Sequence, residues 1–150
     1  MLTAASFSIL QAQTAPTVRK STSVSQASQR QQPGGRLIEE FAFVLSDFKM
    51  LHQGDTSNLD IAISYRYVAG ITKAQYPDFR WLAKDVENLL ANYPNKDDYW
   101  EIVNKRITSL LLTKYPAITS VVCDLKVAPT QLVPYARSSR VTRDRTKVHR

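Results

Sequence analysis

The stretch that decides the fold runs from residue 76 to residue 127 and reads YPDFRWLAKDVENLLANYPNKDDYWEIVNKRITSLLLTKYPAITSVVCDLKV. Apolar side chains recur at three- and four-residue steps in two successive segments, roughly 78–92 and 98–114, which predicts two amphipathic helices. A proline follows shortly after each segment and ends it. From Thr119 to Val127 the apolar residues alternate, which predicts a strand with Val121, Cys123 and Leu125 on one face.

The ends of the two predicted helices carry the residues that helix ends favour. Pro77 suits the first turn of the first helix. Asp97 or Asp98 is expected to cap the second helix, with Glu101 close to the spacing of a capping box. Lys114 lies where the helix dipole favours a cation.

The residues before this stretch predict a β-hairpin. Phe41, Phe43 and Leu45 alternate within 37–50, residues 52–58 are turn formers, and a second alternating run covers 59–68. A weaker alternation over 135–145 predicts a last strand. The order β-β-α-α-β-β predicts an α+β domain over residues 37–136, with both helices on one face of an antiparallel sheet.

The net charge of +7 is concentrated at the ends of the chain. Residues 1–36 hold four basic residues and no acid, and residues 130–150 hold six basic residues and one acid, so residues 37–129 are mildly acidic. The high isoelectric point therefore gives no argument that the domain itself binds nucleic acid. Residues 137–150 are expected to be a basic tail, through which contact with nucleic acid or another acidic partner would be electrostatic and salt-sensitive.

The first 36 residues are rich in Ser, Gln, Thr and Ala, which fits either a disordered extension or a targeting segment. The protein is expected in the cytoplasm, or in an organelle or outside the cell if this segment is a targeting signal. No apolar run approaches the roughly 20 residues of a membrane span. A lone Cys123 excludes a disulfide within the chain, and with His52 and His149 it makes no zinc-binding spacing, so neither a metal nor a cofactor is expected.

Three pieces of the chain together resemble the tunnelling-fold family, and most of all dihydroneopterin aldolase. They are Tyr76-Pro-Asp-Phe79 before the first helix, Trp100-Glu-Ile-Val-Asn-Lys-Arg-Ile107 in the second, and Tyr115-Pro-Ala-Ile-Thr-Ser-Val-Val-Cys-Asp-Leu-Lys126 after it. The resemblance covers roughly residues 71–129. It implies a pterin-like ligand, subunits that close a barrel with sites between them, and retro-aldol cleavage of dihydroneopterin in folate biosynthesis.

The resemblance also implies a role for three residues. Glu101 would bind the pterin by accepting hydrogen bonds from its ring nitrogens, as a planar carboxylate can. Tyr76 and Lys126 would handle protons at the reacting carbon. The family's Tyr-His-Gly segment near the first strand is replaced here by Phe41-Ala-Phe-Val-Leu45, and alternation along the strand turns Lys126 away from the apolar face.

Each of these residues also has an ordinary structural interpretation. Glu101 suits the first turn of any helix, Tyr76 suits packing before a proline, and Lys126 suits a solvated strand end. Tyr65-Arg66-Tyr67 is either a stacking surface for nucleic-acid bases or an exposed cross-strand face. Two function classes therefore stay open, a pterin-binding enzyme and a non-catalytic tunnelling-fold scaffold that contacts partners through its basic ends.

Overall fold

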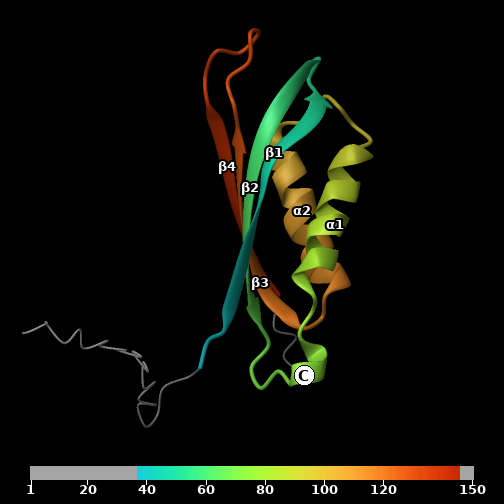
Figure 1. Ribbon diagram of the computed structural model, residues 1–150, viewed down its shortest axis with the longest axis vertical. Coiled ribbons are helices and arrows are strands. Elements are labelled where there is room, and N and C mark those ends of the chain that lie inside the picture. The colour runs from blue at the N-terminus through green and yellow to red at the C-terminus, as the bar shows by residue number, and fades with distance from the viewer. Residues whose placement is uncertain (1–36, 146–150) are drawn as a thin grey trace, which may run out of the picture. The chain divides into compact units, whose positions relative to one another are not determined.

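The computed structural model describes residues 37–145, so the predictions for residues 1–36 and 146–150 lie outside the described residues. Its elements are β1 (Glu40–His52), β2 (Asp55–Tyr67), a short 3-10 helix η1 (Lys73–Gln75), α1 (Phe79–Ala91), α2 (Trp100–Lys114), β3 (Ile118–Val127) and β4 (Arg137–Asp144). The strands form one antiparallel sheet in the order β1-β2-β3-β4. Both helices lie on the same face of this sheet, as Figure 1 shows, which confirms the predicted α+β arrangement.

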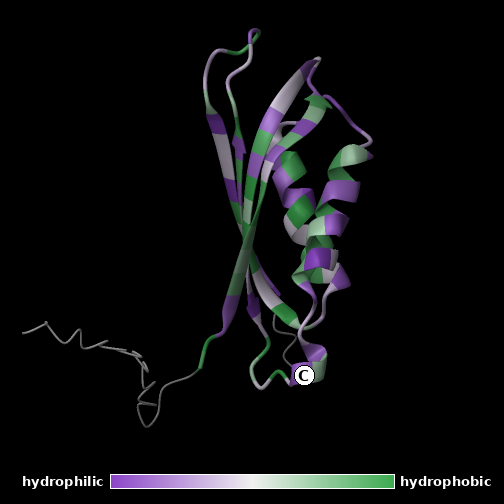
Figure 2. Ribbon diagram, in the orientation of Figure 1, coloured by the Kyte–Doolittle hydropathy of each residue, from purple (hydrophilic) through white to green (hydrophobic). Residues whose placement is uncertain are grey.

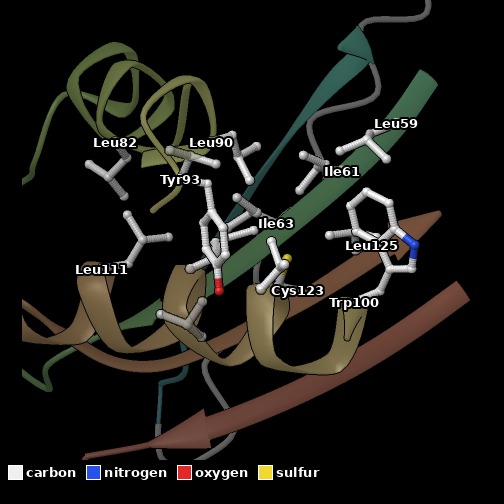
Figure 3. Packing of buried hydrophobic residues seen from close by; sticks show 14 of the residues in the cluster. Leu59, Ile61, Ile63, Leu82, Leu90, Tyr93, Trp100, Leu111, Cys123 and Leu125 are labelled. Atoms are coloured by element: carbon white, nitrogen blue, oxygen red, sulfur yellow. The ribbon is translucent and has the colours of Figure 1, made fainter. Parts of the chain in front are cut away.

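The hydrophobic core lies between the helices and the sheet. Alternate residues of β2 and β3, among them Ile61, Ile63 and Leu125, point toward buried leucines and valines of the helices (Figure 3). Apolar and polar segments alternate along the strands in Figure 2, as expected for a sheet with one covered and one open face. Cys123 is fully buried in this core, and burial raises the pKa of its thiol to about 12, so the thiol stays protonated at neutral pH.

The β1–β2 hairpin turns more tightly than the sequence predicts. Only Gln53 and Gly54 connect the paired residues His52 and Asp55, and both have positive φ, 52° and 77°. Positive φ at both central residues is the geometry of a type I′ turn, whose twist matches that of the flanking strands. Residues 55–58, predicted as turn, therefore belong to β2.

A β-bulge interrupts β1 between Leu45 and Phe48. The extra residue changes the alternation, so that Phe48 and Met50 continue the helix-facing side that Phe43 and Leu45 begin. Asp47, inside the bulge, has φ +53°, and its backbone N–H donates to Asp60 Oδ1 at 3.0 Å. The bulge therefore depends on a side chain of the neighbouring strand.

The helix bounds agree closely with the predictions, but one cap does not. Asp78 caps α1 and accepts a hydrogen bond from the backbone N–H of Arg80. The predicted cap of α2 by Asp97 or Asp98 is wrong, because the N-cap residue is Tyr99 and makes no side-chain cap. The carboxylate of Asp98 instead accepts hydrogen bonds from Tyr93 and Asn95 in the loop between the helices.

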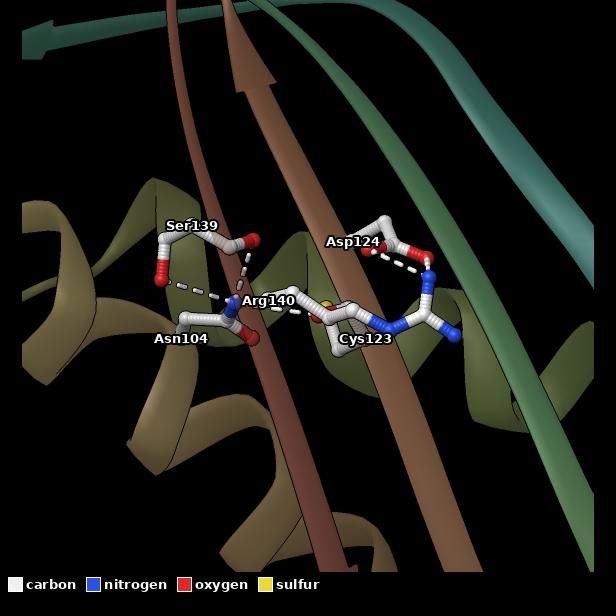
Figure 4. Close-up of polar contacts among 5 residues, drawn as sticks. All are labelled: Asn104, Cys123, Asp124, Ser139 and Arg140. Atoms are coloured by element: carbon white, nitrogen blue, oxygen red, sulfur yellow. Dashed lines mark hydrogen bonds and ion pairs between the residues drawn. The ribbon is translucent and has the colours of Figure 1, made fainter.

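The first half of the predicted basic tail is part of the sheet. Residues 137–144 form the edge strand β4, so the prediction of a tail from residue 137 was wrong and that of a last strand was right. Arg140 pairs with Asp124 of β3 on the open face, and Asn104 of α2 reaches Ser139 of β4 from the helix side (Figure 4). No helix within residues 37–145 has the length and apolar character to cross a bilayer.

Candidate functional site

Glu101 lies in the first turn of α2, where the helix dipole favours an ionised carboxylate. The residue is exposed, and within residues 37–145 its side chain takes part in no hydrogen bond or ion pair. This carboxylate is therefore free to accept hydrogen bonds from a ligand that approaches the start of α2.

The start of α2 is fixed against the end of β1. The ring of Trp100 lies against the ring of His52, with centroids 4.5 Å apart. His52 is buried, and its Nε2 donates to the backbone carbonyl of Asp98 at 2.7 Å. The nitrogen of a second side chain, Gln53, donates to the same carbonyl at 3.0 Å. The backbone beside Glu101 is thus held in place by the hairpin.

Tyr76 lies between η1 and α1 and is engaged with the start of β1. Its hydroxyl donates to Glu39 Oε2 at 2.8 Å, and its ring packs edge-on against Tyr67, with centroids 4.9 Å apart. The hydrogen bond to Glu39 raises the pKa of the Tyr76 phenol. The phenol therefore holds its proton more tightly than a free tyrosine does and is a hydrogen-bond donor to Glu39.

Lys126 lies near the end of β3 on the open face of the sheet, as its alternation with buried Leu125 and Val127 predicts. It is paired in register with Asp60 of β2 and Ser138 of β4. Together with Asp47 and Asp60 it lines a cavity of about 520 Å³ on this face.

The three predicted site residues do not meet within the chain. Tyr76 contacts the start of β1 through Glu39, whereas Glu101 follows Trp100, which packs on the end of β1. A 13-residue strand spans roughly 40 Å, so these two residues lie at opposite ends of the sheet. Lys126 is at the same end as Glu101 but on the opposite face of the sheet.

Three polar residues beside the predicted ones were missed. Glu39 contacts Tyr76, and Asp47 and Asp60 lie beside Lys126. Asp60 was detectable, because its place in the alternating run of β2 puts it on the polar face. Glu39 was not detectable, because it pairs with Tyr76, 37 positions further along the chain. Asp47 was not detectable either, because its position beside Asp60 depends on the bulge in β1. Among residues 37–145 no group of three or more His, Cys, Asp or Glu side chains is placed to hold a metal ion.

Comparison with known proteins establishes the fold. The chain is similar to a dihydroneopterin aldolase from Burkholderia thailandensis, a structure solved with guanine bound, with a TM-score of 0.56 and 14% sequence identity over 73% of this chain and 93% of that one. No family model matches the chain, and no curated protein sequence does. The chain therefore has the tunnelling fold, and at this identity the likeness extends no further than the fold.

Proposed function

We propose that the protein is an assembling tunnelling-fold subunit that binds a pterin-like ring, with Glu101 as the carboxylate that receives it. The observation that carries the proposal is the exposed Glu101 carboxylate, which has no partner within residues 37–145 and lies at a helix start held firmly by Trp100 and His52. The structurally similar aldolase binds guanine. Guanine and pterins share an amino-pyrimidinone edge with adjacent N–H donors, to which one carboxylate can bind in a bidentate manner.

Assembly into a homo-oligomer of four or more subunits is part of the proposal. Within residues 37–145 the outer edges of β1 and β4 pair with no further strand. Unpaired edges expose backbone donors and acceptors, and pairing them between subunits removes that exposure. Strand pairing of this kind also brings residues of different subunits close together. A site that uses both Tyr76 and Glu101 needs this, because the two residues lie at opposite ends of the sheet.

Retro-aldol cleavage of dihydroneopterin, a lyase reaction of folate biosynthesis, is the finer form of the proposal. In it, Lys126 and Tyr76 move protons, and at least Tyr76 acts on a ring that Glu101 of another subunit holds. The phenol of Tyr76 has Glu39 as an adjacent proton acceptor at 2.8 Å. Proton transfer by positioned groups of this kind contributes about 10²- to 10⁴-fold to a reaction rate.

Calorimetric titration of the parent protein and Glu101→Gln with neopterin tests the proposal. The amide keeps the shape of the side chain but turns an N–H toward a ring N–H, and an unpaired buried donor costs about 1–3 kcal/mol, or roughly ten- to a hundredfold in affinity. Lys105→Gln, an exposed change one turn further along α2, is the matched control and should bind like the parent. Equal affinities of parent and Glu101→Gln, or no binding by the parent, would sink the proposal.

A scaffold without catalysis is the second candidate, and the separation of the three residues favours it. Tyr76 and Glu101 lie at opposite ends of β1, and Lys126 is on the other face of the sheet. A scaffold predicts that the protein assembles but neither binds neopterin nor cleaves dihydroneopterin. Chromatographic assay of the released aldehyde and pterin, run beside the titration, separates an active enzyme, a binding protein and a scaffold.

A further inference from the structure

One residue of each strand contributes to a row of polar side chains across the open face of the sheet. Lys126 of β3 is opposite Asp60 of β2 on one side and Ser138 of β4 on the other. Asp47 of β1 completes the row, because the bulge brings its backbone N–H within 3.0 Å of Asp60 Oδ1. Without the bulge, the regular pairing of β1 would place a different residue beside Asp60.

This row forms part of the lining of the cavity of about 520 Å³, with Asn58 and Arg137 beside it. A volume of this size fits a small organic molecule. Asp60 and Lys126 are direct cross-strand neighbours of opposite charge, yet no ion pair joins them among the described residues. One oxygen of Asp60 receives the Asp47 N–H, and the ammonium of Lys126 has no partner within residues 37–145. Among the described residues, the second oxygen of Asp60 and the ammonium of Lys126 are therefore both available to a ligand.

The charges of the lining select the class of ligand. Two carboxylates, Asp47 and Asp60, balance two cations, Lys126 and Arg137. A phosphate would meet both carboxylates, and a polyamine would meet both cations, so each would face repulsion as well as attraction. Hydroxyl groups donate to carboxylates and accept from ammonium and amide N–H groups, so a chain of neighbouring hydroxyls satisfies both kinds of side chain.

We infer that this cavity binds a neutral polyhydroxylated small molecule, a free sugar or sugar alcohol. The site uses residues of all four strands and excludes Glu101, which does not line the cavity. It goes beyond the proposed function because it requires neither a pterin ring nor an oligomer.

Amide chemical shifts of the ¹⁵N-labelled full chain, titrated with xylitol and with D-ribose, test the inference. The amides of Asn58, Ala128 and Ser138 should shift in a saturable manner, with dissociation constants in the millimolar range, on the order of 1–10 mM. Asp60→Asn keeps an oxygen that can accept the Asp47 N–H but removes the charge, and Lys126→Met removes the donor. Each should weaken xylitol binding about tenfold or more.

Control variants outside the cavity distinguish binding at this site from a change in the protein as a whole. Asp124→Asn lies on the same face but outside the cavity and should bind xylitol like the parent, as should Glu101→Gln even if it has lost neopterin. Melting curves and amide spectra establish that each variant is folded, and Lys126→Ala, which also removes the donor, replaces any Lys126→Met protein that is not. Saturable shifts only with inorganic phosphate or only with spermidine would overturn the inference. So would no polyol response at roughly 100 mM, or equal responses in parent, Asp60→Asn and Lys126→Met.

Discussion

Asp85 shows how single residues hold the two helices together. Its carboxylate accepts hydrogen bonds from Lys114 Nζ at 2.6 Å and from the Tyr115 hydroxyl at 2.5 Å. Burial opposes ionisation of Asp85, but these two donors outweigh it and hold the pKa of the carboxyl below its ordinary value. Burial, and after it the same contact with Asp85, raise the pKa of the Tyr115 phenol.

We expect Asp85→Asn to lower the free energy of unfolding at pH 7 by about 1–2 kcal/mol, because hydrogen bonds to a charged group are lost and Lys114 is half exposed. A folded-state pKa below the unfolded one means that this stability is present above pH 4, roughly the unfolded value, and is lost as the pH falls toward the folded value. Urea unfolding of both proteins should therefore show a difference that shrinks below about pH 4. Glu87→Gln, which breaks an exposed pair with Lys84, should change stability by less than about 0.5 kcal/mol. If the difference in unfolding free energy between the parent and Asp85→Asn stayed constant with pH, the ionised Asp85 carboxylate would not be its source.

At the scale of residues, sequence reasoning found side chains more reliably than their partners. Tyr76, Glu101 and Lys126 were selected because they are polar and lie near element ends, and the structure places all three near such ends. Glu39 and Asp85 were not selected, because their partners are 37 and about 30 positions away and pairing at that distance follows from the tertiary fold. Whether the three selected residues bind or catalyse stays a prediction.

One buried polar side chain, that of Asn104, joins α2 to the edge strand. Asn104 is fully buried, and its Nδ2 donates to the backbone carbonyl of Cys123 at 3.1 Å and to that of Ser139 at 2.9 Å (Figure 4). A third, longer contact of 3.2 Å joins it to the Ser139 hydroxyl. The amide thus ties α2 to both β3 and β4.

Replacing Asn104 with leucine should lower the free energy of unfolding by about 2 kcal/mol or more, since buried carbonyls lose their donor. Asn104→Asp should cost more, because a carboxylate would face two carbonyl oxygens. Hydrogen exchange should show the loss first in β4, the strand held at its edge by this contact. Thr113→Leu, an exposed change near the end of the same helix, is the control. Faster exchange spread evenly over the sheet would contradict a local role in holding β4.

At the scale of elements, the periodicity of apolar residues predicted the helices and strands well. It did not predict two local features, the cap of α2 and the bulge in β1. Both helices end within two residues of their predicted bounds, since apolar spacing and prolines determine them. The prediction that Asp98 caps α2 was wrong, because the Asp98 carboxylate accepts hydrogen bonds from Tyr93 and Asn95 and none from the backbone N–H groups at the start of the helix. The bulge at Asp47 was not predicted, because positive φ is uncommon in a non-glycine residue and an aspartate within an alternating run does not by itself mark one.

At the scale of the whole molecule, the order of elements predicted the α+β arrangement, and the resemblance carried by residues 71–129 predicted the tunnelling fold, but one chain does not contain the proposed site. The two ends of β1 separate Tyr76 from Glu101 by roughly the length of the strand. A catalytic site that uses both therefore has to be completed by another subunit. This requirement is a physical consequence of the fold and does not depend on which ligand binds.

Mixed assembly tests that consequence. Light scattering should first give four or more subunits for the parent protein. Glu101→Gln and Tyr76→Phe should each lose most retro-aldol activity, because the first cannot hold the ring and the second cannot move the proton. If each site takes Glu101 from one subunit and Tyr76 from its neighbour, random co-assembly of the two variants in equal amounts restores about a quarter of the sites, since that fraction receives both native residues. Co-assembly of Glu101→Gln with a Glu101→Gln, Tyr76→Phe double variant contains no native Glu101 and should restore none. No recovery in the first mixture, with both single variants folded, assembled and inactive, would show that the site is not shared in this way.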